Sequence, residues 1–255
     1  MNPLLKLLAD NRGVGQFRAD AAEQEATIYL YDVIVADDYW GGIGVESFVR
    51  TLNSLTAPVI HLRFDCPGGD VFAGRAMEQA IREHPSKIIA HIDGYAASAA
   101  SYVALAADEV LISEGGFFMI HKAWTIAIGN ADELMDVAGL LEKIDGTLVK
   151  TYARETGQTP EQLNEWIAAT TWFDAEEAIE YGFATGMDTL GSKAKAKAPA
   201  QHWNLAAYGH APQPAPVAEP DPVPEPEPTP EPIAAYNNSH TDHLARRLRL
   251  VAHAA

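Results

Sequence analysis

The sequence predicts an α/β fold with a mainly parallel sheet, and three observations lead to this prediction. Strand-like and helix-like patterns alternate between residues 26 and 190, which implies crossover connections between parallel strands, with helices covering both faces. Residues 130–154 place apolar side chains at spacings of three and four, as an amphipathic helix does. After residue 190 the composition shifts to alanine, lysine, proline and glutamate, so we expect the folded domain to end there.

The first half of this domain should contain five strands and three helices. The run of β-branched and aromatic residues over 26–35 predicts the first strand. Small apolar residues over 96–107 predict a helix that is buried on all sides. In chain order the expected elements are a strand over 26–35, a helix over 45–55, a strand over 59–64, a helix over 70–84, a strand over 88–92, a helix over 96–107, and strands over 110–112 and 117–120.

Three further helices are predicted after residue 130, and each has a start signal. Asn130 followed by Glu133 has the pattern of a capping box at the start of the long helix. Pro160 favours the first turn of the next helix, where its missing N–H has no helical partner to lose. Asp174 and Glu177 form a second capping pattern and predict a short last helix.

The composition divides the chain into four parts. Residues 212–232 carry a proline at about every second position with acidic residues between, which predicts an extended, charged spacer. The final stretch has leucine and valine at helical spacing among arginines, and either a small basic helix or a disordered tail fits this pattern. The predicted parts are an N-terminal arm over 1–25, a folded domain over 26–190, a linker over 191–235 and a tail over 236–255.

Charge and cysteine content exclude several classes of protein. The formal net charge of −17 argues against a nucleic-acid-binding protein, because no basic surface could offset such a negative field. Cys66 is the only cysteine and cannot form an internal disulfide, and no apolar stretch is long enough for a membrane span or a signal peptide. We therefore expect a cytoplasmic protein without membrane contact. Metal-ligand spacings and a phosphate-binding loop are also missing from the sequence, so we expect no metal and no cofactor.

Three short motifs carry groups that could take part in catalysis. The turn Pro67-Gly68-Gly69 follows a strand, and its glycines leave backbone N–H groups open to a ligand. Ser98 lies near a helix start, where free N–H groups favour developing negative charge. His121 ends a strand, and the ordinary histidine pKa of about 6.5 suits a base. Alone, each motif fits an ordinary structural role better than a catalytic one, and Cys66 fits a buried packing role better than a nucleophilic one.

Taken together, the motifs resemble the ClpP-type serine peptidases of the ClpP/crotonase superfamily. Over residues 26–188 the family's landmarks occur in order: a PGG turn, GYAAS at a helix start, MIH at a strand end, a long amphipathic helix, and WFDAEEAIEYGFA. The resemblance implies repeated ββα units with a mainly parallel sheet, a long handle helix and a disordered C-terminal tail. The chain most resembles the ClpP-related head-maturation proteases of tailed phages and prophages, at residues 39–42, 65–72, 121–130 and 171–173 and in its acidic, proline-rich extension.

The resemblance also implies catalytic roles. Ser98 corresponds to the nucleophile, His121 to the general base, and the backbone N–H groups of Gly69 and Ala99 to the oxyanion hole. The family's third catalytic position, an acid, is occupied here by Thr170. A threonine can accept a hydrogen bond from the imidazole but cannot stabilise the imidazolium by charge. Either a Ser–His pair with a neutral orienter or an inactive relative is compatible with this sequence.

Four functions are compatible with these motifs. The first is an endopeptidase that cleaves capsid or scaffold proteins during phage head maturation, in the host cytoplasm or the procapsid, with substrate extended beside residues 70–72 and 123–128. The second is the proteolytic subunit of an ATP-dependent Clp protease served by an AAA+ unfoldase. The third is an inactive assembly module, and the fourth is an acyl-CoA enzyme of the crotonase type, which would not need Ser98 and His121 in this order. The resemblance further implies a homo-oligomer, as a heptameric ring or stacked rings joined through the long helix.

Overall fold

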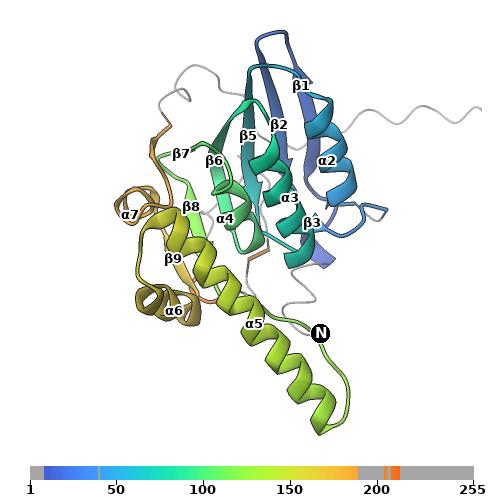
Figure 1. Cartoon of the computed structure of the whole chain (residues 1–255), viewed down its shortest axis with the longest axis vertical. Helices are drawn as coiled ribbons and strands as arrows, with labels where there is room; N and C mark the ends of the chain where they lie inside the picture. The colour runs from blue at the N-terminus through green and yellow to red at the C-terminus, as the bar shows by residue number, and fades with distance from the viewer. Residues whose placement is uncertain (1–8, 40, 189–203, 206–207, 213–255) are drawn as a thin grey trace, which may run out of the picture. The chain divides into compact units, whose positions relative to one another are not determined.

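The computed structural model describes residues 9–39, 41–188, 204–205 and 208–212, and these ranges form an α/β fold (Figure 1). The strands are β1 (Gln16–Ala21), β2 (Glu25–Tyr31), β3 (Ile34–Val35), β4 (Ile43–Gly44), β5 (Val59–Cys66), β6 (Lys87–Ala97), β7 (Glu109–Ile112), β8 (Phe117–Ile120), β9 (Thr171–Phe173) and β10 (Gly186–Met187). The helices are α2 (Val45–Ser54), α3 (Val71–Glu83), α4 (Ala99–Ala104), α5 (Ala131–Thr156), α6 (Pro160–Ala169) and α7 (Ala175–Glu180). Most of the predicted linker and all of the predicted tail lie outside the described ranges.

The main sheet is mixed but mainly parallel, which confirms the predicted fold class. Its strand order is β1-β2-β5-β6-β7-β10, and β8 is attached through β6 and continues to β9. The β1–β2 and β8–β9 pairs are antiparallel, and the other strand pairs of this sheet are parallel. Within the described ranges, no helix is long and apolar enough to cross a bilayer.

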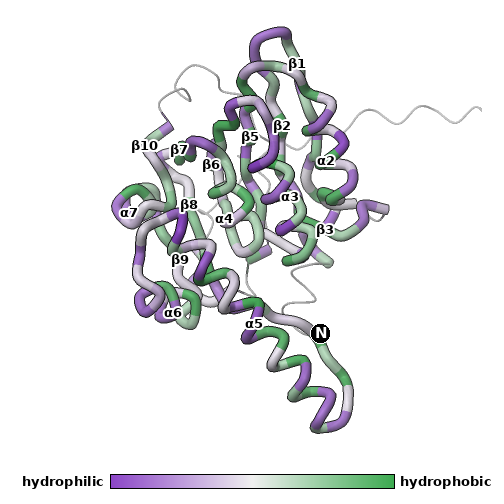
Figure 2. Tube along the Cα trace, in the orientation of Figure 1, coloured by the Kyte–Doolittle hydropathy of each residue, from purple (hydrophilic) through white to green (hydrophobic). Residues whose placement is uncertain are grey.

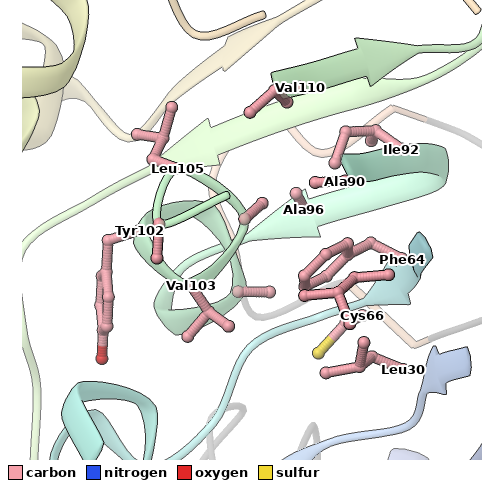
Figure 3. Packing of buried hydrophobic residues seen from close by; sticks show 14 of the residues in the cluster. Leu30, Phe64, Cys66, Ala90, Ile92, Ala96, Tyr102, Val103, Leu105 and Val110 are labelled. Carbon is pink, nitrogen blue, oxygen red and sulfur yellow. The ribbon is translucent and has the colours of Figure 1, made fainter. Parts of the chain in front are cut away.

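Helices α2, α3 and α4 pack on one face of the sheet and form the core with it (Figures 1 and 3). Alternate side chains of β2 and β5 are buried, and the positions between them are mostly half-buried. Leu30 and Phe64 of neighbouring strands share the cluster with Val103 of α4. The expectation of helices on both faces is wrong for the described residues. The second face instead carries polar pairs such as Arg63 with Asp93.

The segment expected as an N-terminal arm adds an edge strand to the sheet. Strand β1 pairs with β2 along its whole length, and Phe17 on it packs against the core. The strand predicted over 26–35 is interrupted at Asp32, whose carboxylate accepts hydrogen bonds from the backbone N–H groups of Gly13 and Gly15 at 3.1 and 3.2 Å. These bonds divert the chain after β2 and separate β2 from β3.

Strand β6 is longer than predicted, and the following helix is shorter. The strand runs to Ala97 because residues 95–97 pair with β8, in a register that sets Ala97 opposite Met119. The buried helix expected from residue 96 consequently begins at Ala99. The sequence of small residues fits both states, and the pairing with β8 decides between them.

The three helix starts predicted after residue 130 are confirmed. The side-chain oxygen of Asn130 accepts from the N–H of Glu133 at 3.1 Å, and that of Asp174 accepts from the N–H of Glu177 at 2.9 Å. Both pairs form complete capping boxes. Pro160 occupies the first turn of α6 after a threonine cap.

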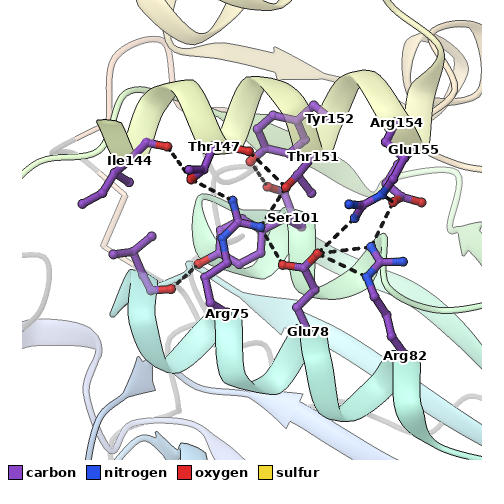
Figure 4. Close-up of polar contacts among 12 residues, drawn as sticks. Arg75, Glu78, Arg82, Ser101, Ile144, Thr147, Thr151, Tyr152, Arg154 and Glu155 are labelled. Atoms are coloured by element: carbon purple, nitrogen blue, oxygen red, sulfur yellow. Dashed lines mark hydrogen bonds and ion pairs between the residues drawn. The ribbon is translucent and has the colours of Figure 1, made fainter. Parts of the chain in front are cut away.

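A polar cluster joins α3 to the C-terminal half of α5 (Figure 4). Glu78 is 6% exposed and accepts from Arg75, Arg82 and Arg154 at 2.6, 3.2 and 3.3 Å. Arg75 also donates to the hydroxyl of Thr151 on α5 at 2.8 Å. The cluster therefore fastens one half of α5, whereas the other half extends away from the sheet in Figure 1.

Replacing Glu78 with alanine should lower the free energy of unfolding by about 3 kcal/mol, because it leaves the arginines around a buried position without their carboxylate. Urea denaturation followed by circular dichroism measures this change. Glu83→Ala is the matched control, since Glu83 lies exposed on the same helix and should change stability by less than about 0.5 kcal/mol. Equal changes in the free energy of unfolding for the two substitutions would show that the polar cluster does not stabilise the fold.

Candidate active site

Ser98 occupies the turn between β6 and α4. It is the N-cap residue of α4, with φ of 53° and ψ of −122°, a backbone conformation that L-residues rarely adopt. Its N–H donates to the carbonyl of Met119 at 2.9 Å, which fixes the turn to the end of β8. The side chain is half-buried and lines a cavity of about 570 Å³.

His121 follows β8 directly, and this position brings it to Ser98. Strands β6 and β8 are parallel neighbours, so their C-terminal ends meet at the same edge of the sheet. Ser98 Oγ and His121 Nε2 lie 2.7 Å apart in a hydrogen bond. The structure therefore joins two residues that are separated by two strands and a helix in the sequence.

The imidazole of His121 is neutral at physiological pH. Burial lowers its pKa from the ordinary value of 6.5 to about 4, because a buried site disfavours the charged form. No charge in the described part of the chain contributes to this shift. A neutral Nε2 that contacts a hydroxyl is able to accept the proton of that hydroxyl.

The glycine turn lies against the start of α4. Gly68 has φ of +94°, and a Cβ there would come within 2.7 Å of Ser98 Cβ and 2.9 Å of the Ala99 nitrogen. Gly69 and Ala99 line the same cavity as Ser98 and His121. Among the described residues, nothing accepts a hydrogen bond from the N–H of Gly69 or of Ala99. Both groups are thus available to an oxygen atom bound beside Ser98.

The cavity is lined mainly by apolar side chains. Its lining includes Val71 and Phe72 at the start of α3 and residues 123–126. The sequence predicts an extended substrate beside both of these segments. Leu141 and Ile144 of α5 also line the cavity.

Thr170 is near His121 in the fold but makes no hydrogen bond with it. The antiparallel pairing of Thr171 with Ile120 places Thr170 next to the backbone of His121. Thr170 ends α6 with φ of 56°. Within the described ranges, no side chain bonds to His121 Nδ1 and no carboxylate pairs with this ring. The orienting role of Thr170 accordingly stays a prediction.

Cys66 and Tyr208 complete the surroundings of the pair. Burial raises the pKa of the Cys66 thiol, and its Sγ lies 2.9 Å from the carbonyl oxygen of Asp32, which fits the packing role predicted for it. None of the sequence motifs points to Tyr208, a residue of the predicted linker whose ring contacts His121. The local signal that could have revealed it is the presence of two large apolar residues, Leu205 and Tyr208, in the predicted linker over 191–235.

Comparison with known proteins identifies the family. The family model described as Clp protease matches residues 46–188, more than half of the chain. Similar proteins include ATP-dependent Clp protease proteolytic subunit 2 of Treponema pallidum, 31% identical over 155 residues that cover 60% of this chain and 77% of the relative. The subunit of the same name from Treponema denticola is 33% identical over 143 residues, which cover 54% and 72%.

Solved structures show the same fold. A ClpP1 variant from Listeria monocytogenes matches with a TM-score of 0.55 over 63% of this chain and 90% of its own length, at 21% identity. The landmarks, the sequence relatives and the fold agree. The chain belongs to the Clp protease family and is a ClpP family serine peptidase.

Proposed function

We propose that the chain is a serine endopeptidase in which Ser98 is the nucleophile and His121 the general base. The observation that carries the proposal is the 2.7 Å hydrogen bond between Ser98 Oγ and His121 Nε2, in a cavity that also contains Gly69 and Ala99. A serine hydroxyl becomes an effective nucleophile when a base accepts its proton, and a neutral imidazole is placed to do so.

The expected reaction has two stages. Ser98 Oγ attacks the carbonyl carbon of the peptide while its proton passes to His121 Nε2, and the N–H groups of Gly69 and Ala99 donate to the resulting oxyanion. His121 then gives the proton to the leaving amine, and the C–N bond breaks to leave an ester on Ser98. In the second stage a water molecule gives a proton to His121, attacks the ester and releases the acid, and the proton returns to Ser98.

We expect this peptidase to be slower than one with a full triad. The imidazolium formed in each stage has no carboxylate partner among the described residues, so its charge is not stabilised. A base with a pKa of about 4 also provides a small driving force for proton transfer at neutral pH. If the missing carboxylate abolishes the reaction completely, the chain is an inactive assembly module.

The proposed setting is a proteolytic subunit of an ATP-dependent Clp protease that works with an AAA+ unfoldase. The two Treponema relatives and one from Pseudomonas aeruginosa carry that name, and none of the three is named as a head-maturation protease. Cleavage of capsid or scaffold proteins in a phage head consequently has less support, and it stays a prediction from the sequence.

Family membership implies peptide substrates and oligomeric rings. We infer that α5 joins the subunits, because Leu134, Met135 and Leu140 of this helix expose apolar side chains. Figure 2 shows hydrophobic positions along the part of α5 that extends from the domain. A heptameric ring or a pair of stacked rings is the expected assembly, as the resemblance implies.

Labelling with a fluorophosphonate probe tests the catalytic proposal. The wild-type protein should be labelled at one residue, identified as Ser98 by peptide mapping, and Ser98→Ala and His121→Ala should not be labelled. Ser101→Ala is the matched control, since Ser101 belongs to the same sequence motif but bonds to Tyr152 in the interior. No labelling of the wild-type protein in any oligomeric fraction would favour the inactive assembly module.

A further inference from the structure

A segment from the C-terminal part of the chain lies against the catalytic pair. Leu205 and Tyr208 are each 6% exposed and form a cluster with Ala97 and Met119. Ala97 immediately precedes Ser98, and Met119 lies two residues before His121. The segment thus packs on the strand ends that carry both catalytic residues.

Hydrogen bonds hold this segment on both sides of Tyr208. Asn11 is 2% exposed, and its side chain donates to the carbonyl of Asn204 at 2.9 Å and accepts from the N–H of Asn204 at 2.7 Å. On the other side, Trp172 Nε1 donates to the carbonyl of Gly209 at 3.0 Å. Such specific pairing of backbone groups is characteristic of an integral part of a domain.

Tyr208 contacts the imidazole of His121 and the oxyanion turn, which is residues 67–69. Its hydroxyl donates to the carbonyl of Pro67 at 2.8 Å. Its ring meets the imidazole of His121 edge-on, with the ring centres 5.0 Å apart and the planes at 69°. Tyr208 does not line the cavity, so it lies behind the pair and leaves the path of a substrate open.

This contact matters because no acid in the described part of the chain orients the imidazole. In a Ser-His-Asp triad the carboxylate holds the imidazole in the productive orientation. Here the hydrogen bond to Ser98 holds Nε2, and within the described ranges Nδ1 has no hydrogen-bond partner. Ser98 and Tyr208 contact the ring of His121, and Thr170 lies beside its backbone. None of these three side chains is charged at neutral pH. Steric contact with the Tyr208 ring is therefore a restraint on the ring of His121.

We propose that Tyr208 is a positioning residue, whose ring holds the imidazole of His121 toward Ser98 and whose hydroxyl fixes the oxyanion turn through Pro67. The inference rests on the serine-peptidase function proposed above. It also makes the segment around Tyr208 part of the active site, although this segment follows the region that matches the Clp protease family. Two substitutions separate the roles of the ring and of the hydroxyl.

Tyr208→Leu removes the ring and the hydroxyl but keeps an apolar side chain that fills much of the space. We expect kcat on a short fluorogenic peptide to fall at least about tenfold with KM within about twofold of wild type, because positioning acts on the transition state. The acid limb of kcat/KM should move upward from about pH 4 toward 6.5, since water gains access to His121. Tyr208→Phe keeps the ring, so its acid limb should not move, and kcat should fall about fivefold through the lost hydrogen bond.

Tyr31→Leu and Tyr31→Phe are the matched controls. Tyr31 is also buried and donates one hydroxyl hydrogen bond, to Asp93 at 2.5 Å, but it contacts neither Ser98 nor His121. These controls should lose stability without a shift of the acid limb. A folded Tyr208→Leu protein with wild-type kcat and a wild-type acid limb would overturn the proposal, as would Tyr31 variants that behave like the Tyr208 variants.

An NMR titration of the His121 ring in the full-length chain measures the contact without catalysis. Its pKa should rise by at least about one unit in Tyr208→Leu, and an unchanged value would refute the positioning role even in a protein without activity. If the fluorophosphonate probe does not label the wild-type protein but the His121 pKa rises in Tyr208→Leu, the peptidase mechanism is refuted and the contact between Tyr208 and His121 is retained. If the probe labels Ser98 but Tyr208→Leu changes neither the His121 pKa nor kcat, only the role of Tyr208 is refuted.

Discussion

Replacing His121 with alanine should lower kcat/KM by about 10²- to 10⁴-fold, the range that a positioned general base contributes. The loss follows from the 2.7 Å contact of Nε2 with Ser98 Oγ, which no other side chain in the described ranges can replace. The control is His84→Ala, because His84 is a half-buried histidine that bonds to the carbonyl of Leu52 away from the cavity. A wild-type rate in His121→Ala would exclude this residue as the base.

His121 also sets the expected pH dependence of kcat/KM and of stability. Its pKa of about 4 lies below the ordinary 6.5, so the imidazole stays neutral and able to accept a proton until the pH falls through about 4. The acid limb of kcat/KM should lie near that value, and a limb at pH 6.5 or above would contradict the assignment. Unfolding restores the ordinary pKa, so the contribution of His121 to stability is complete above pH 6.5 and declines as the pH falls toward 4.

Local sequence signals predicted most of the elements. The caps at Asn130 and Asp174 and the spacing within 131–156 are properties of consecutive residues, and the helices begin where these signals stand. The pairing of Ser98 with His121 is different, because neither motif alone distinguishes a catalytic from a structural residue. The family resemblance supplied that pairing, and the parallel register of β6 and β8 is its physical basis.

The parts that sequence reasoning missed depend on contacts between distant segments. The length of β6 depends on β8, and β1 is fixed by pairing with β2, which no local pattern reveals. Tyr208 is the clearest case, since its partners Pro67 and His121 meet only after the sheet has formed. The local composition around Tyr208 is dominated by the proline-rich stretch that follows it, and this composition concealed a segment with its own buried residues.

Gly69 is the position where the backbone leaves least room for another residue. It has φ of +149°, a conformation that L side chains rarely adopt, and a Cβ there would overlap the carbonyl oxygen of Ile34. That carbonyl accepts from the N–H of Asp70 at 2.9 Å, and the N–H of Ile34 donates to Gly68 at 2.8 Å. A backbone shift that relieves the overlap must therefore break these two hydrogen bonds. It must also move the N–H of Gly69, which points to the oxyanion in the proposed mechanism.

Gly69→Ala should consequently lower the free energy of unfolding by at least about 3 kcal/mol, and any folded fraction should lose about 10²-fold or more in kcat. Urea denaturation measures the first effect, and the rate per fluorophosphonate-reactive site measures the second. Gly139→Ala is the control, because Gly139 lies within α5 with no atom within 4 Å of the added Cβ and should be stabilised by about 0.5–1 kcal/mol. If Gly69→Ala matched wild type in both measurements, the turn would be neither strained nor part of the oxyanion hole. A loss of kcat at unchanged stability would instead confine the role of Gly69 to the bound oxyanion.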